Sequence, residues 1–370
     1  MAAGIKTKVK SVLRAVMLHN RNKKIYLQYK PFCEKHKDDW EPLSSEELSK
    51  GYGKDRYTYT MLKNFGSDGQ RDLSQYVTTA QYKSDFLPRL NRLDHTITGN
   101  AFHSLLVDKN YFPLLFPEFI HPHAVVRKMQ GVLYDENYRP IDEETALRLM
   151  SAYDALVFKI SRDSSQGRGV KRVEKTDYQR MLTEYGNNFL VQEIIKQHEC
   201  FSYFNESSVN VVRILSLCWR GTVYILCAKL KVGAPGAFID LGVTDMNPVE
   251  VGINEDGTFD NRAFEAEFDF KVYRTVFGKK IQGCVPGFDK MKDLVKQAHI
   301  RFPDYGILGW DLTVDKNGRI VFIEVNSRGP AIDDSQCICG PFFNKLSKDG
   351  HPLKEEILSE PLDLNGLKAF

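Results

Sequence analysis

The sequence predicts an α+β protein, and three observations favour this class. First, two β-rich runs within 307–326 flank the dipeptide Asn317-Gly318, which tolerates the positive φ angles of a tight hairpin turn. Second, the runs 209–219 and 222–232 are apolar and long enough to form two further strands. Third, residues 289–302 place their apolar side chains on one helical stripe. Strands and helices are therefore mixed along the chain.

The first hundred residues have a different pattern. Residues 9–17 have the spacing of a basic amphipathic helix, and Ser44 to Glu47 form a capping-box sequence that starts another helix. A helix packed on its own protein is favoured for 9–17, with a membrane or polyanion contact left open. We expect a helical region at 1–100, a core at 101–345 and a C-terminal tail at 346–370.

Composition and charge limit the classes of function. The 370 residues are 42% hydrophobic and 27% charged, as in an ordinary globular protein, and the net charge of +3 indicates no nucleic-acid partner. The sequence contains no run of 18 or more apolar residues, so it predicts no membrane-spanning helix. The seven cysteines are odd in number and irregularly spaced, which favours reduced thiols in a cytoplasmic protein. A homo-oligomer is left open.

The hairpin carries the first candidate site. With a two-residue turn at 317–318, the ladder puts Asp311 opposite Glu324, and Asn326 joins their face because side chains alternate with period two. Like charges directly opposite are destabilising unless something neutralises them. Two carboxylates and an amide oxygen suit Mg²⁺, which keeps waters and substrate phosphates in its other positions. The alternative is a solvated sheet face, and another turn length would shift the register.

A second candidate site follows the buried-strand sequence 155–160, which contains the single lysine Lys159. The next residues form a loop rich in serine and glycine, and such a loop lets backbone N–H groups surround phosphate oxygens. A strand lysine beside it adds a fixed positive charge. The Walker pattern is absent, and a plain hairpin turn is an equally good interpretation of the loop.

The run 189–195 predicts a strand whose end suits a planar base, because an apolar slot there has main-chain hydrogen-bonding groups at its edge. Glu193, His198 and Glu199 lie at that end. Each alone is weak evidence, since a glutamate at a strand end is usually solvated.

Arg213 is the single charged residue in the apolar strand 209–219, so its guanidinium would be buried and needs an anion. One interpretation is a structural ion pair with an internal acid. The other is a clamp on a transferring phosphoryl group or carboxylate. With a turn at 220–221, Asn210 would lie opposite Lys231.

Taken together and in this order, these features resemble the ATP-grasp superfamily, and within it the sugar-transfer-associated branch. The resemblance covers about residues 100 to 345. The motifs that carry it are Lys159 before the loop Ser164 to Gly169, Asn210-Val211-Val212-Arg213, Gly309-Trp310-Asp311 and Glu324-Val325-Asn326.

The resemblance implies two α+β subdomains, 101–205 and 206–345, that grip ATP between them. It assigns the metal to Asp311, Glu324 and Asn326, and the adenine hinge to Gln192 to Ile195. The implied ATP-binding residues are Lys159, Ser164, Ser165, Gly167, Gly169, Gln192, Glu193, Ile195, His198, Glu199 and Lys231. The implied catalytic residues are Lys159, Asn210, Arg213 and Arg328, the last because it follows the metal ligands closely and suits an anionic substrate.

The resemblance implies an ATP- and Mg²⁺-dependent ligase that joins a small-molecule carboxylate to an amine through an acyl phosphate. The branch points to an amino sugar, amino acid or related metabolite in glycan or natural-product biosynthesis. Two alternatives stay open: an ATP-grasp kinase that phosphorylates a hydroxyl acceptor, and a nucleotide-binding module without ligase chemistry. A ligase requires both substrates before it releases ADP, whereas a kinase requires one acceptor.

Overall fold

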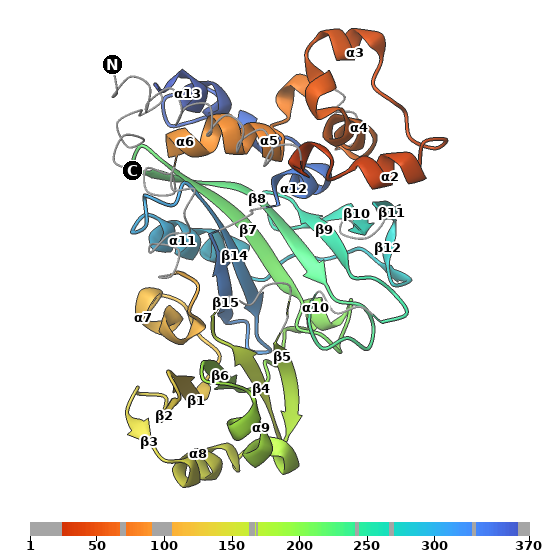
Figure 1. Cartoon of the computed structure of the whole chain (residues 1–370). Helices are drawn as coiled ribbons and strands as arrows, with labels where there is room; N and C mark the ends of the chain where they lie inside the picture. Colours follow the sequence, from red (N-terminus) through yellow and green to blue (C-terminus); the bar gives the residue numbers. More distant parts are fainter. Residues whose placement is uncertain are drawn as a thin grey trace, which may run out of the picture. The chain divides into compact units, whose positions relative to one another are not determined.

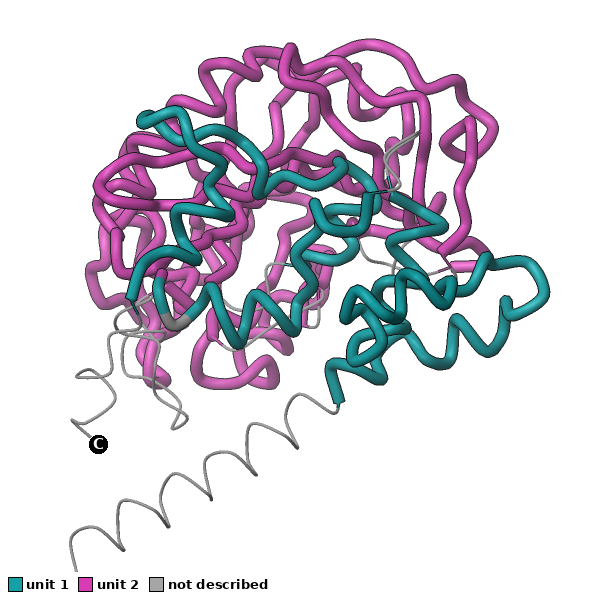
Figure 2. The backbone as a smooth tube through the Cα atoms, turned by 90° about the horizontal axis from the view of Figure 1, so that it is seen from above, with its two compact units in different colours: residues 1–89, 331–364 teal, residues 90–330, 365–370 magenta. Residues whose placement is uncertain are grey.

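The computed structural model describes residues 24–66, 72–90, 106–162, 167, 169–240, 244–265, 270–327 and 331–361. The chain forms two compact units, which Figure 2 colours separately. Unit 1 comprises residues 1–89 and 331–364, and unit 2 comprises residues 90–330 and 365–370. The helix expected at 9–17 lies outside the described residues.

Unit 1 is helical and is built from both ends of the chain. Ser44 and Glu47 make the reciprocal hydrogen bonds of a capping box, which confirms the helix start expected there. Val77 exchanges two hydrogen bonds with the Gln336 side chain, so the C-terminal segment is fixed against the N-terminal helices. The main helices are α2 (Lys30–Lys35), α3 (Ser45–Ser49), α4 (Arg56–Phe65), α5 (Thr79–Gln81), α6 (Leu87–Leu90), α12 (Ile332–Cys339) and α13 (Leu353–Ser359).

Unit 2 contains a six-stranded sheet, here called the small sheet, with strand order β3-β2-β1-β6-β4-β5 (Figure 1). Its strands are antiparallel neighbours, and α8 (Glu143–Met150) and α9 (Tyr178–Glu184) share one core with them. Leu156 and Phe158 enter that core, so Lys159 faces the other side of the sheet. The strands are β1 (Ala124–Met129), β2 (Val132–Tyr134), β3 (Pro140–Ile141), β4 (Ala155–Ile160), β5 (Val170–Glu174) and β6 (Phe189–Gln192).

The second sheet of unit 2, here called the large sheet, has seven strands in the order β11-β10-β9-β8-β7-β14-β15. Its apolar face packs on α11 (Phe288–His299) and on aromatic residues around α7 (Phe112–Leu115). Val212 and Ile214 enter this core, so Arg213 between them projects from the opposite face. The strands are β7 (Val211–Trp219), β8 (Thr222–Val232), β9 (Val249–Ile253), β10 (Phe259–Glu265), β11 (Lys271–Tyr273), β14 (Ile307–Val314) and β15 (Ile320–Asn326).

Two short pieces complete unit 2. The helix α10 (Glu199–Ser202) follows the small sheet, and β12 (Thr275–Val276) pairs with β13 (Lys279–Lys280) as a separate ribbon. The α+β class with a helical N-terminal region is therefore confirmed.

No described helix is long and apolar enough to cross a membrane. The seven cysteines all lie in the described ranges and are free thiols.

The turn of the β14–β15 hairpin differs from the expected one. The Asp315 N–H donates to the Arg319 carbonyl at 2.9 Å, and the Gly318 N–H donates to the Asp315 carbonyl at 2.9 Å. The loop therefore has three residues, with Gly318 at φ 76°, and Val314 pairs with Ile320. The expected two-residue turn was wrong.

A β-bulge restores the expected register at the candidate site. Leu312 pairs with Phe322, but the next pair along the ladder is Asp311 with Glu324. Ile323 is the additional residue of β15, and it shifts the register by one. The longer turn and the bulge cancel, so the expected pairing of Asp311 with Glu324 is confirmed.

Candidate active site

Asp311, Glu324 and Asn326 are brought together on the non-core face of the hairpin. The Asn326 amide nitrogen lies 3.2 Å from Oδ2 of Asp311 and 3.3 Å from Oε1 of Glu324. Two carboxylates and an amide oxygen suit Mg²⁺, once the amide turns to present Oδ1 in place of Nδ2. In the described residues no group of three or more His, Cys, Asp or Glu side chains could hold a metal, so a metal site here would include the Asn326 amide oxygen.

Arg213 meets one of these carboxylates. β7 and β14 are neighbours, and their register pairs Arg213 directly with Asp311. The guanidinium donates through Nε to Oδ1 and through Nη2 to Oδ2, the latter at 2.6 Å. Burial disfavours the charged carboxylate, but the guanidinium outweighs burial and holds the pKa of Asp311 below its ordinary value. The anion that the sequence required for Arg213 is thus the expected metal ligand itself.

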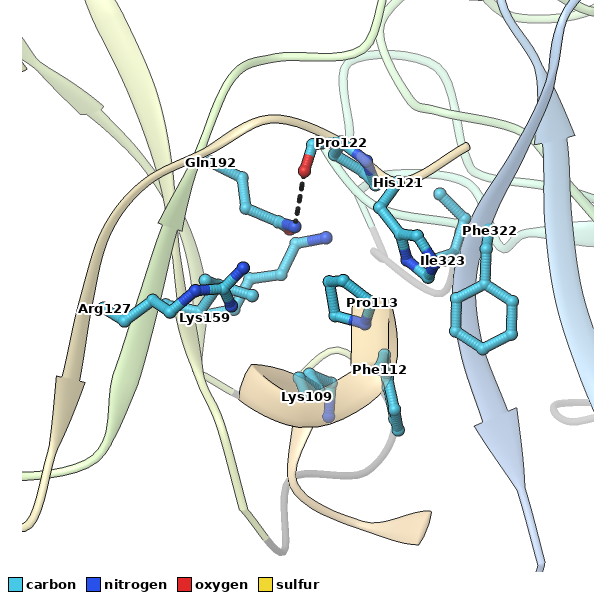
Figure 3. A pocket seen from close by; sticks show the side chains of 11 residues that line it. Lys109, Phe112, Pro113, His121, Pro122, Arg127, Lys159, Gln192, Phe322 and Ile323 are labelled. Carbon is cyan, nitrogen blue, oxygen red and sulfur yellow. Dashed lines mark hydrogen bonds between the residues drawn. The ribbon is translucent and has the colours of Figure 1, made fainter. Parts of the chain in front are cut away.

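Lys159 projects from β4 into a small pocket within unit 2 (Figure 3). Burial, and then the charge of Lys109, lower the pKa of Lys159 to about 8. The cavity volume is about 10 Å³, room for roughly one water molecule. A nucleotide phosphate could therefore enter this pocket only if some of the lining side chains moved. The pocket is lined by Lys109, Phe112, Pro113, His121, Pro122, Arg127, Lys159, Leu190, Gln192, Phe322 and Ile323.

The glycine-containing loop connects β4 and β5 as a hairpin, because Lys159 pairs with Val170 across the two strands. Gly167 and Gly169 have φ angles of 67° and 72°, the region that favours glycine. A Cβ on Gly169 would lie 2.4 Å from Cδ1 of Ile160, so Ile160 would have to shift to admit a side chain there. Ser164 and Ser165 lie outside the described residues, as does Arg328.

Comparison with protein families supplies the decisive observation. Residues 162–342 match the sequence model of the family described as sugar-transfer associated ATP-grasp. This part of the chain belongs to the sugar-transfer associated ATP-grasp family. The matched residues include Arg213, Asp311, Glu324 and Asn326, whereas Lys159 lies just before them.

Solved structures with which the chain aligns include the biotin carboxylase domain of 2-oxoglutarate carboxylase from Hydrogenobacter thermophilus, described in complex with MgADP and bicarbonate. The identity is 15%, the alignment covers 63% of this chain and 45% of that one, and the TM-score is 0.37. For VanG D-Ala:D-Ser ligase from Enterococcus faecalis the identity is 16%, the coverages are 64% and 59%, and the TM-score is 0.36.

The chain thus spans roughly half the length of the solved structures it matches, with 45% and 59% for these two. At such identities and TM-scores the likeness carries no argument about substrate. A comparison with curated proteins found no match.

The segment expected to contact adenine leaves the small sheet earlier than the sequence indicated. β6 ends at Gln192, not at Ile195. Gln192 lines the Lys159 pocket, and its amide nitrogen lies 3.3 Å from the Pro122 carbonyl. Among described residues the Ile195 N–H has no hydrogen-bond partner, as expected of a group that could receive a base.

Glu193 lies at the end of β6 in a polar cluster. Its Oε1 accepts a hydrogen bond from the Tyr153 hydroxyl at 2.7 Å and lies 3.0 Å from Nδ1 of His123. His198 and Glu199 are not among the residues that line the pocket. His198 caps α10 instead, because its Nδ1 accepts the Cys200 N–H at 3.2 Å.

Asn210 lies in a buried network of its own. Its amide nitrogen donates to the carbonyls of Phe201 and Asn205, both at 2.8 Å, and its Oδ1 accepts from the Ser208 hydroxyl at 2.9 Å. Every polar atom of the amide is thus engaged within the protein. The network fixes the chain that leads into β7.

The turn expected between β7 and β8 is present, but a bulge shifts their ladder. Lys231 consequently lies opposite Val211, and the expected pairing with Asn210 was wrong. Lys231 is buried and forms an ion pair with Asp240 at 2.6 Å. Burial opposes its charge, but Asp240 outweighs burial and raises the pKa of Lys231 above its ordinary value.

Lys109 is a candidate functional residue that sequence reasoning missed. It begins a short 3₁₀ turn, Lys109–Tyr111, and its N–H donates to the Ser161 carbonyl at 2.9 Å. That bond places Lys109 beside Lys159, and Nζ of Lys109 lies 3.5 Å from Oε2 of Glu324. A lysine at the start of a helical turn is ordinary, so the sequence held no signal that singled it out.

Proposed function

We propose that the protein is an ATP- and Mg²⁺-dependent ligase that joins a small-molecule carboxylate to an amine. The observation that carries the proposal is the group formed by Asp311, Glu324 and Asn326, with Arg213 held against it. Lys109 and Lys159 line a pocket of unit 2 together with Phe322 and Ile323 of β15. Nζ of Lys109 lies 3.5 Å from Oε2 of Glu324, so a cation lies beside a hard oxygen ligand, as a Mg²⁺-bound polyphosphate requires.

In this proposal, Lys109, Lys159 and the loop around Gly167 and Gly169 hold the phosphates of ATP. The segment from Gln192 to Ile195 holds adenine. Mg²⁺ held by the hairpin residues would neutralise charge on the transferring phosphoryl group.

The reaction follows from the weakness of a carboxylate as an electrophile. A carboxylate oxygen of the substrate attacks the γ-phosphorus of ATP, the bond to the β-phosphate oxygen breaks, and ADP leaves. The amine nitrogen then attacks the carbonyl carbon of the acyl phosphate, the carbon–oxygen bond to phosphate breaks, and the nitrogen loses a proton as phosphate departs. Arg213 can stabilise the negative charge that develops on the acyl phosphate.

Ser164 and Ser165 would contact phosphate, and Arg328 would contact an anionic substrate, as the family resemblance implies. An amino sugar, amino acid or related metabolite is the proposed substrate class. It rests on the family alone.

The decisive experiment is an ADP-release screen over paired carboxylates and amines with Mg²⁺. A ligase releases ADP only when both partners are present. Release with a single hydroxyl acceptor would select the kinase alternative. Nucleotide-dependent thermal stabilisation without ADP release in any pairing would favour a binding module.

A further inference from the structure

Arg127 is a buried cation whose nearest acid, Asp108, attracts it only at longer range and is itself paired with Arg162 at 2.6 Å. It projects from β1, is 3% exposed, and forms no ion pair in the described part of the chain. Its Nη1 donates to the Asn110 carbonyl at 3.1 Å, and its guanidinium lies 4.5 Å from the centroid of the Tyr138 ring. Its Nε has no hydrogen-bond partner. A buried guanidinium with an unsatisfied N–H group destabilises the folded protein unless an anion binds it.

The same pocket already contains two lysines. Arg127 and Lys159 are both cross-strand partners of Leu190, from opposite sides of β6, so the two cations project from one face of the small sheet. Figure 3 shows Arg127, Lys159 and Lys109 around the pocket, each from a different element. The carboxylate of Glu324 approaches Lys109. Three cationic side chains therefore line one small pocket.

A purely structural role for Arg127 is the competing explanation. The guanidinium would then serve to hold the Asn110 carbonyl, and through it the turn that carries Lys109. However, the Tyr138 hydroxyl donates to that same carbonyl at 2.6 Å. A neutral group therefore already performs this task, and a buried charge adds a desolvation cost that hydrogen bonding to one carbonyl does not require.

We propose that Arg127 is a nucleotide-binding residue that contacts the phosphate chain together with Lys109 and Lys159. The inference rests on the proposed function. Arg127 would make binding depend on the phosphate charge of the ligand, because a guanidinium binds phosphate oxygens strongly. Recognition of the base would depend on the segment from Gln192 to Ile195.

The test compares Arg127→Met, Arg127→Lys and Tyr138→Phe with the wild type by calorimetric titration of adenosine, ADP, ATP and inorganic tripolyphosphate. Arg127→Met should weaken ATP binding roughly 10-fold to 100-fold, the usual effect of losing a hydrogen bond between charged groups. Adenosine binding should change less than about twofold, and Arg127→Lys should recover part of the loss. Arg172→Met serves as the control, because Arg172 is an exposed arginine of β5.

Two outcomes would overturn the inference. One is an equal loss for adenosine and ATP in Arg127→Met; the other is a Tyr138→Phe variant that reproduces the Arg127→Met profile, as the structural role requires. Tripolyphosphate separates this inference from the proposed function. Binding of tripolyphosphate that depends on Arg127, without binding of ATP, would support the anion contact and refute the nucleotide function. Circular dichroism of each variant verifies that it is folded.

Discussion

The Nζ of Lys109 lies 3.5 Å from Oε2 of Glu324, while the Asn326 amide nitrogen lies 3.3 Å from Oε1 of the same carboxylate. Glu324 therefore has a cation on one oxygen and a neutral donor on the other. It joins the hairpin of the large sheet to the turn beside the small sheet. Glu324 thus contacts Lys109, which would bind phosphate, and Asn326, which would bind magnesium.

Replacing Glu324 by Gln should remove metal-dependent nucleotide binding and spare the fold. The Glu324 side chain is 27% exposed, so its amide form remains tolerable. We expect the rise in melting temperature produced by ADP with Mg²⁺ to disappear, and turnover to fall roughly 100-fold or more. Glu174→Gln, an exposed glutamate of β5, is the control. A variant that keeps the full Mg²⁺-dependent rise would refute the metal assignment.

The ion pair between Arg213 and Asp311 should show strong coupling. Arg213→Met alone leaves a buried carboxylate, and Asp311→Leu alone leaves a buried guanidinium, so each should cost about 3–5 kcal/mol. The double variant should cost less than the sum, because neither charge remains unpaired. Urea unfolding of the four proteins measures this. Additive costs would mean that the two residues do not depend on each other.

Nucleotide binding should weaken at alkaline pH. Burial and the charge of Lys109 lower the pKa of Lys159 to about 8, so this ammonium is charged below pH 8 and neutral above it. A phosphate favours the ammonium form, and affinity for ADP should therefore fall as the pH rises above about 8, by at most about tenfold per unit. Titrations between pH 7 and 9.5 follow the effect. Lys159→Arg stays charged, so its affinity should be level over this range.

His299 should make the protein less stable in mild acid. Its Nδ1 lies 2.7 Å from the Ser216 hydroxyl and its Nε2 lies 2.6 Å from the Tyr305 carbonyl, so a neutral ring fits both partners. Burial lowers the pKa of His299 to about 4 from its ordinary 6.5. The folded form thus resists protonation, and stability present above pH 6.5 is lost between 6.5 and 4, by roughly 3 kcal/mol.

The measurement is urea unfolding at pH 7.5 and at pH 4.5 for the wild type and for His299→Gln. The difference between the two proteins cancels most contributions of other groups that titrate over this range. His299→Gln should be less stable at pH 7.5 and should lose less on acidification. Equal losses in both proteins would show that the ring does not control this dependence.

Four strands of the large sheet were predictable because their sequences are long and mainly apolar: β7, β8, β14 and β15. β8 has the expected limits, and Asp311 faces Glu324 as expected. Bulges were not predictable, since they depend on how strands twist and pack. In the hairpin a bulge and a longer turn compensated each other, whereas the bulge between β7 and β8 moved Lys231 away from Asn210.

Tertiary contacts decided the remaining differences. Nothing in the sequence pattern indicates that Asn210 is occupied by carbonyls of Phe201 and Asn205, or that His198 serves as a helix cap. Residues 331–345 were expected to belong with the core. In the structure, Asp333 instead accepts the N–H of Thr79 at 2.7 Å within unit 1. Such partners are distant in sequence, and local patterns contain no information about them.

Unit 1 consists of two segments that are far apart in the sequence, and this affects the order in which the two units can fold during synthesis. A ribosome releases residues 24–89 long before α12, yet Val77 and Met61 have their partners Gln336 and Cys337 in that helix. These first helices must therefore wait until α12 has been synthesised before they can complete their packing. The strands of both sheets of unit 2 lie within residues 124–326, so they have all of their sheet partners by then. The nascent chain should consequently form the two sheets of unit 2 before it completes unit 1.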